Sequence, residues 1–188
     1  MSAELPDDAA AQADALWLFS LDVYGRERVK EALLTLQETI NADVNLMLLA
    51  CWLAQEHYPL DRDTAQTLRE ISRHWQSEIV VPLRGVRHRL KDRLRDRTLA
   101  ERQSHADLRQ QVLDLELQAE RLEQQLLVRA LGPLQHSSVD PLTLCLANLA
   151  ALVSLSSQAE PHVRHLLSAI WPSTVDKMWE QASRRFLP

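Results

Sequence analysis

Glycine is scarce in this chain of 188 residues, which holds 3 Gly, at positions 25, 85 and 132. Loops that cradle phosphates need closely spaced glycines, because only these let the backbone approach the ligand. We therefore expect no Walker or dinucleotide-binding loop. With 46% hydrophobic and 25% charged residues, the composition also excludes collagen-like and disordered proteins.

Cysteine is rarer still, with Cys51 and Cys145 each inside an apolar run and neither in a C-x-x-C pair. This is too few for a disulfide-rich secreted domain. We expect two reduced, buried and inert thiols.

Long apolar runs are also missing, since none reaches the roughly 18 residues of a membrane-spanning helix. The N-terminus carries Glu4, Asp7 and Asp8 where a secretory signal would be basic. We expect a cytoplasmic protein with no membrane contact. The formal net charge of -5 disfavours a surface that coats nucleic acid as a whole.

Familiar catalytic and metal-binding patterns are missing too. There is no G-x-S-x-G elbow and no H-E-x-x-H helix, and His162 and His165 share a helix face without a third ligand. We therefore predict no catalytic residue, no cofactor and no metal site, which favours a protein that is not an enzyme and leaves an enzyme as an alternative.

Apolar spacing predicts an all-α fold, a compact bundle of about six to eight helices with a long amphipathic helix or helical arm. A first helix should begin after Asp7 or Asp8 and end near Tyr24, and a second should cover residues 29–40. Residues 43–58 are apolar on all sides, which is typical of the central helix.

Three parts are expected along the chain: an acidic N-terminal segment (1–13), a single helical domain (14–155) and a C-terminal helical extension (156–188). Asp61 or Asp63 should cap a fourth helix, and Asp140 a later one with Pro141 in its first turn. Pro82 should end the first layer of helices.

Residues 83–131 read as helical throughout. They contain an apolar seam with heptad spacing, which favours a helical hairpin or a dimeric coiled coil. Capping-box spacings at Thr98 and Ser104 predict a break between residues 97 and 108. The seam consists of Leu108, Val112, Leu115, Ala119, Leu122 and Leu126.

Residues 84–97 form a basic segment with seven basic and two acidic side chains, a local net charge of +5. Arginine predominates, which suits bidentate contacts to carboxylate or phosphate. We expect either a solvated face that binds an acidic partner or, alternatively, a surface for RNA or DNA phosphates. The basic residues are Arg84, Arg87, Arg89, Lys91, Arg93, Arg95 and Arg97.

Asp43 and Asn45 are polar groups at the start of the central apolar helix, and polar groups in a core need partners. Arg84, Arg87 and Lys91 share one helix face and could supply them. Two interpretations follow: an internal network with an ion pair from Asp43 to Arg84 or Arg87, or a small-anion pocket walled by Trp52 or Trp75.

Several short blocks of sequence together resemble a proteobacterial family of unknown function, over about residues 14–155. The resemblance implies an all-helical cytoplasmic protein and brings no established reaction. The blocks are Leu16-Trp17, Phe19-Ser20-Leu21, Tyr24, Leu36-Gln37, 42–46, Trp52-Leu53-Ala54, Trp75, Val81-Pro82-Leu83-Arg84, Arg87 and Leu90-Lys91.

Together these observations favour a non-enzymatic interaction or regulatory module that uses the basic helix and the apolar seam. We expect a protein partner, with self-association through residues 104–131 as one form of it. Nucleic-acid binding through residues 84–97, and a small-anion-binding protein or enzyme with a pocket at Asp43, Asn45, Arg84 and Arg87, are the alternatives.

Overall fold

The computed structural model describes residues 8–92 and 99–186, and these residues contain helices but no strand. Helices α4, η1 and α5 follow one another without a break, so the described chain forms eight continuous helical segments. The all-α prediction is confirmed. The elements are α1 (Ala9–Tyr24), α2 (Val29–Ile40), α3 (Val44–Gln55), α4 (Arg62–Trp75), the π-helical turn η1 (Gln76–Val80), α5 (Val81–Asp92), α6 (Leu99–Arg129), α7 (Pro141–Leu152), α8 (Glu160–Ile170) and α9 (Pro172–Ser183).

Aspartate side chains start four of the helices where the sequence predicts helix starts. Each carboxylate accepts a hydrogen bond from a backbone N–H of the first turn, which would otherwise have no partner. The four caps are Asp8 to Ala10, Asp43 to Leu46, Asp61 to Thr64 and Asp140 to Thr143.

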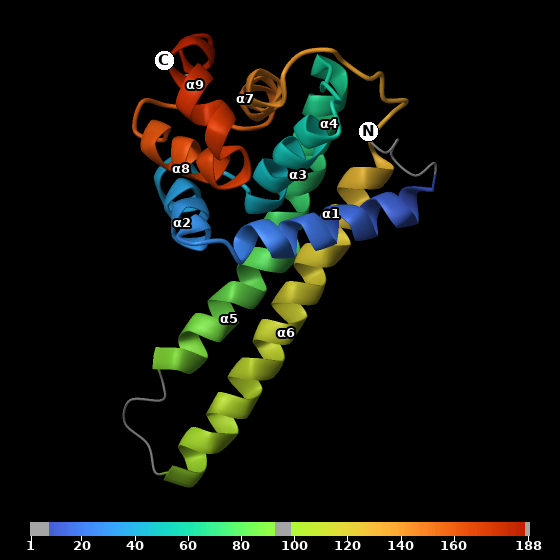
Figure 1. Cartoon of the computed structure of the whole chain (residues 1–188). Helices are drawn as coiled ribbons and strands as arrows, with labels where there is room; N and C mark the ends of the chain where they lie inside the picture. Colours follow the sequence, from blue (N-terminus) through green and yellow to red (C-terminus); the bar gives the residue numbers. More distant parts are fainter. Residues whose placement is uncertain (1–7, 93–98, 187–188) are drawn as a thin grey trace.

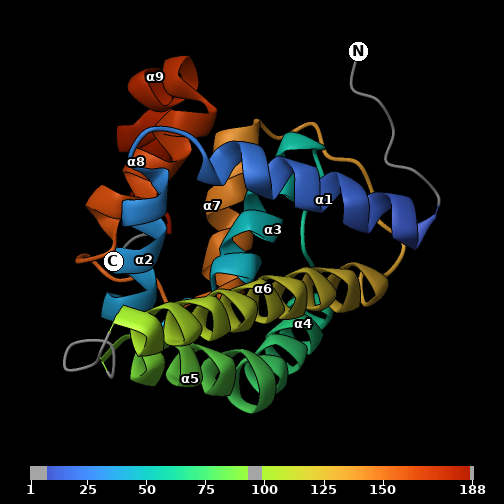
Figure 2. The same ribbon diagram turned by 90° about the horizontal axis from the view of Figure 1, so that it is seen from below.

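Helix α3 is the central helix, and every residue from 45 to 54 is buried. It packs most extensively against α7, with α1, α2, α4 and α6 also in contact (Figures 1 and 2). Cys51 and Cys145 meet at the contact between α3 and α7, with the two Sγ atoms 3.5 Å apart and both thiols free and buried. Burial raises the pKa of Cys145 well above its usual value, which keeps this thiol protonated.

Pro82 does not end a layer of helices, so that prediction is wrong. The helix continues through it because η1 widens the preceding turn, and the Val81 N–H donates to the Gln76 carbonyl five residues back. Such a π-helical turn accommodates a proline that has no N–H of its own.

Helices α5 and α6 form an antiparallel hairpin that extends away from the other helices (Figure 1). At 31 residues, α6 is roughly 45 Å long at about 1.5 Å per residue. The break predicted between residues 97 and 108 is not found within α6, which runs unbroken from Leu99. The Ser104 pattern lies inside this helix, where Gln103 Nε2 donates to Asp107 Oδ1 at 2.8 Å.

The C-terminal helices complete the body of the protein. Helix α8 packs against α2, and α9 packs against α7 and α8 (Figure 2). Apolar side chains of both helices therefore belong to the same core as α3. No helix in the described part of the chain has the length and hydrophobicity needed to cross a membrane.

We predict that Leu49→Ala lowers the free energy of unfolding by about 2–5 kcal/mol, because Leu49 is fully buried in α3 and truncation leaves a cavity. Urea unfolding followed by far-UV circular dichroism measures the change. Leu18→Ala on α1 is the control, since Leu18 is 66% exposed, and should differ from wild type by less than about 0.5 kcal/mol. Equal losses in the two variants would contradict a core centred on α3.

Candidate functional site

One side of the α5–α6 hairpin carries a network of ion pairs. Arg84 Nε donates to Glu116 Oε1 at 2.9 Å and its Nη2 to Glu120 Oε1 at 3.2 Å, while Arg87 Nε donates to Glu116 Oε2 at 2.6 Å. Glu116 is 4% exposed. Although burial opposes ionisation, hydrogen bonds from Arg87 and Arg84 lower the pKa of Glu116, so it stays charged.

These contacts correct the predicted partners of the basic segment. Arg84 and Arg87 bind glutamates of α6 instead of Asp43, because the hairpin brings the two helices together along their length. Arg89 and Lys91 are exposed. The remaining arginines of the segment, Arg93, Arg95 and Arg97, lie outside the described residues.

The other side of the hairpin is apolar and exposed. Val86 precedes Arg87 and Leu115 precedes Glu116, and in antiparallel helices this equal displacement rotates both toward the same side. The other apolar residues lie seven positions from Val86 or Leu115, which returns them to nearly the same side of their helix. We call this surface the apolar side of the hairpin. It consists of Ile79 (38% exposed), Val86 (37%), Leu108 (48%), Leu115 (51%) and Leu122 (49%).

The predicted apolar seam of α6 is divided between two environments. Val112 and Ala119 are buried, whereas Leu108, Leu115 and Leu122 contribute to the apolar side of the hairpin. Leu126 is partly buried. Only Val112, Ala119 and Leu126, half of the predicted seam, are therefore covered by packing within the chain.

A buried polar network lies where α6 crosses the central helix. Glu123 Oε2 accepts hydrogen bonds from Asn45 Nδ2 and Gln76 Nε2, both at 2.8 Å. Gln124 Nε2 donates to Asn45 Oδ1 at 2.9 Å and to Ser20 Oγ at 3.0 Å. The network joins α1, α3, η1 and α6, and it satisfies the polar group that the sequence places in the core.

Glu123 is fully buried and has no cationic partner among the described residues. Burial and the neighbouring Asp43 carboxylate together raise the pKa of Glu123 to about 9. It is therefore a neutral acid at pH 7. Asp43 itself accepts hydrogen bonds from the Leu46 N–H at 3.1 Å and from Ser72 Oγ at 2.8 Å.

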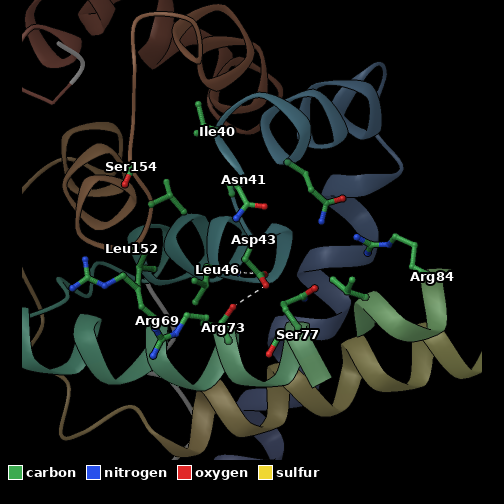
Figure 3. A pocket seen from close by; sticks show the side chains of 16 residues that line it. Ile40, Asn41, Asp43, Leu46, Arg69, Arg73, Ser77, Arg84, Leu152 and Ser154 are labelled. Atoms are coloured by element: carbon green, nitrogen blue, oxygen red, sulfur yellow. Dashed lines mark hydrogen bonds between the residues drawn. The ribbon is translucent and has the colours of Figure 1, made fainter. Parts of the chain in front are cut away.

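Asp43 also faces a pocket of about 660 Å³ between the ends of α2 and α7 and the adjoining parts of α3, α4, η1 and α5 (Figure 3). Of the predicted pocket residues, Asp43 and Arg84 line it. Asn45 and Arg87 face the polar contacts described above, and Lys91 does not line it.

The two predicted tryptophan walls lie elsewhere. Trp52 is buried in the core at 2% exposure, and Trp75 Nε1 donates to the Ala119 carbonyl at 3.0 Å. Both residues support the packing around α3 and α6 and neither lines the pocket.

None of the predictions above names the glutamates that bind the arginines, although the sequence carries a signal for them. Glu116 and Glu120 lie four positions apart, on one side of a helix, as Arg84 and Arg87 do three positions apart. The arginines that complete the pocket, Arg69 and Arg73, gave no comparable signal because an exposed helix face is normally charged.

A family model described as Protein of unknown function (DUF2390) matches residues 15–127. The chain belongs to this family. The DUF2390 match confirms the expected family of unknown function and includes both helices of the hairpin, together with α2, α3, α4 and most of α1. It ends before α7, so the expected extent to residue 155 exceeds it. No curated protein and no solved structure matches the chain.

We predict that Glu123→Gln stabilises the protein at pH 8 and flattens its pH dependence. Between the ordinary value of 4.5 and the folded pKa of about 9, the unfolded chain releases the Glu123 proton while the folded chain keeps it. Stability from this group is thus complete below about pH 4.5 and falls as pH rises, by at most about 1.4 kcal/mol per pH unit.

A glutamine at position 123 keeps the acceptor for Asn45 and Gln76 without the ionisable proton. Urea unfolding of both proteins from pH 4 to pH 9 is the measurement. Wild type and variant curves that run parallel over this range would show that Glu123 titrates normally.

We predict that Arg84→Ala lowers the free energy of unfolding by about 1–3 kcal/mol, because it removes one of two cations from the buried Glu116 carboxylate. Arg89→Ala, on the exposed face of the same helix, is the control and should change stability by less than about 0.5 kcal/mol. Thermal or urea unfolding compares them, and a neutral Arg84→Ala would mean that the network contributes nothing.

Proposed function

We propose that this DUF2390 protein is a non-enzymatic interaction module whose partner is a second copy of itself, docked through the apolar side of the hairpin. The observation that carries the proposal is the gathering of five large, exposed apolar side chains on one side of a projecting pair of helices. Exposed apolar groups of this kind, in one contiguous place, mark interaction surfaces.

The spacing of these residues favours a helical partner. Leu108, Leu115 and Leu122 recur every seven residues, the repeat of a helix that packs lengthwise on another helix. The hairpin already supplies two antiparallel helices. Two hairpins facing each other would make a four-helix bundle, in which the exposed leucines form the core.

The charges beside the apolar side favour a second copy. Arg89 lies at its α5 edge, whereas Asp107 and Asp114, which precede two leucines of the stripe, lie at its α6 edge. Arg121, which precedes the third, is paired with Asp14. When α5 of each copy lies over α6 of the other, a two-fold axis sets opposite charges against each other at both edges. A self-complementary surface is what an isologous dimer requires.

The alternative function, binding of nucleic-acid phosphates through residues 84–97, has less support. Arg84 and Arg87 already bind Glu116 and Glu120, which reduces their charge toward an external phosphate. Among the described members of the segment, Arg89 and Lys91 remain exposed.

We predict that the wild-type protein is a dimer and that Leu115→Glu makes it a monomer. A charge at the middle of the leucine stripe would be buried without a partner in the bundle, whereas it is solvated in the separate chain. Size-exclusion chromatography with light scattering distinguishes the dimer from the 21.5 kDa chain.

Leu18→Glu is the matched control, since Leu18 is exposed on α1 and is not part of the apolar side of the hairpin. It should remain dimeric, and both variants should keep the wild-type circular dichroism spectrum. A monomeric wild type, or a Leu115→Glu variant that stays dimeric, would refute the proposal.

A further inference from the structure

The pocket beside Asp43 has a basic wall that the hairpin proposal does not use. Arg69 and Arg73 come from successive turns of α4, and Arg84 comes from α5 (Figure 3). Asp43 is the one carboxylate among the lining residues of the described chain. Because Arg84 is paired with Glu116 and Glu120, it is Arg69 and Arg73 that outnumber Asp43 and favour negatively charged groups in the pocket.

Arg73 is the residue of this wall with no partner. Its side chain is exposed and makes no hydrogen bond or ion pair with any described residue, whereas Arg26 and Arg184 pair with an acidic residue four positions away. Arg69 lies one turn before Arg73, and two like charges at this spacing repel each other. An anion between them would remove that repulsion.

The other charged groups of the pocket are already tied to the protein. Arg69 Nη1 donates to the Ala151 carbonyl at 3.1 Å, which fixes its guanidinium at the end of α7. Asp43 accepts from Leu46 and Ser72, so its carboxylate serves the start of α3 and the side of α4. An entering ligand therefore meets one oriented guanidinium, that of Arg69, and does not need to displace an ion pair of Arg73.

Around this basic wall the pocket offers both apolar and polar surface. Ile40, Leu152 and Val153 provide apolar contacts, and Asn41 and Ser77 provide hydrogen-bonding groups. Asn41 ends α2 in the left-handed conformation, with φ of 51°, which turns the chain toward α3 at the pocket. The mixture suits a small organic molecule better than a bare ion.

We infer that this pocket is a binding site for a small organic anion, whose carboxylate or phosphate group is held by Arg73 and Arg69. Arginine pairs recognise either group through parallel N–H donors. The site is independent of the apolar side of the hairpin, so either proposal can fail without the other.

Isothermal titration calorimetry of the full chain with inorganic phosphate and with malonate, at constant chloride, tests the inference. We expect at least one probe to bind with a Kd of about 1 mM or tighter. Arg73→Gln should weaken that binding about tenfold or more, because it removes a charged donor. Preference for one probe identifies the oxyanion as phosphate or carboxylate.

Arg62→Gln is the matched control, since Arg62 is an exposed arginine of α4 that does not line the pocket. It should bind as wild type does. Absence of heat for both probes up to about 10 mM, or equal weakening in the two variants, would overturn the site. Because both arginines are exposed, the circular dichroism spectra should remain those of wild type.

Discussion

The rest of the structure depends on the burial of one neutral carboxyl group, that of Glu123. It accepts hydrogen bonds from α3 and from η1, and its neighbour Gln124 extends the network to α1. A buried carboxylate without a cation would be costly, so this arrangement requires the protonated form. The network fixes where α6 crosses the central helix, and thereby how the hairpin leaves the body of the protein.

The two sides of the hairpin differ in whether their side chains find partners within the chain. On one side, Arg84 and Arg87 are satisfied by Glu116 and Glu120 within the chain. On the other, Leu108, Leu115 and Leu122 of α6 are large apolar side chains that remain about half exposed. The charged side holds the helices together, and the apolar side is the surface that we propose a second copy covers.

Much of the fold could be predicted from local signals. Asp8, Asp43, Asp61 and Asp140 each mark a helix start, and the apolar run around Trp52 marks the centre. The pairing of helices could not be predicted in the same way, because it depends on contacts between residues far apart in sequence. Thus Arg84 was expected beside Asp43, and its binding of Glu116, 32 residues away, needed the hairpin.

The candidate pocket was predictable only in part for the same reason. Asp43 stands out because it is polar at the start of an apolar helix. Arg69 and Arg73 do not, since nothing local separates a pocket arginine from a solvated one. Leu152, Val153 and Ser154, at the end of α7, complete the pocket although they lie more than 70 positions after Arg73 in the sequence.

The π-helical turn η1 determines which side of α5 faces α6. Its extra residue rotates the following helix by about 100° relative to an unbroken α-helix. Through this rotation, Ser72 on α4 reaches Asp43 while Arg84 on α5 reaches Glu116. Deleting one residue of this turn would rotate α5 by about 100°, bringing Gly85 and His88 to the places of Arg84 and Arg87 beside the glutamates, and Arg87 to the place of Val86. Insertions and deletions near η1 should therefore be far less tolerated than substitutions.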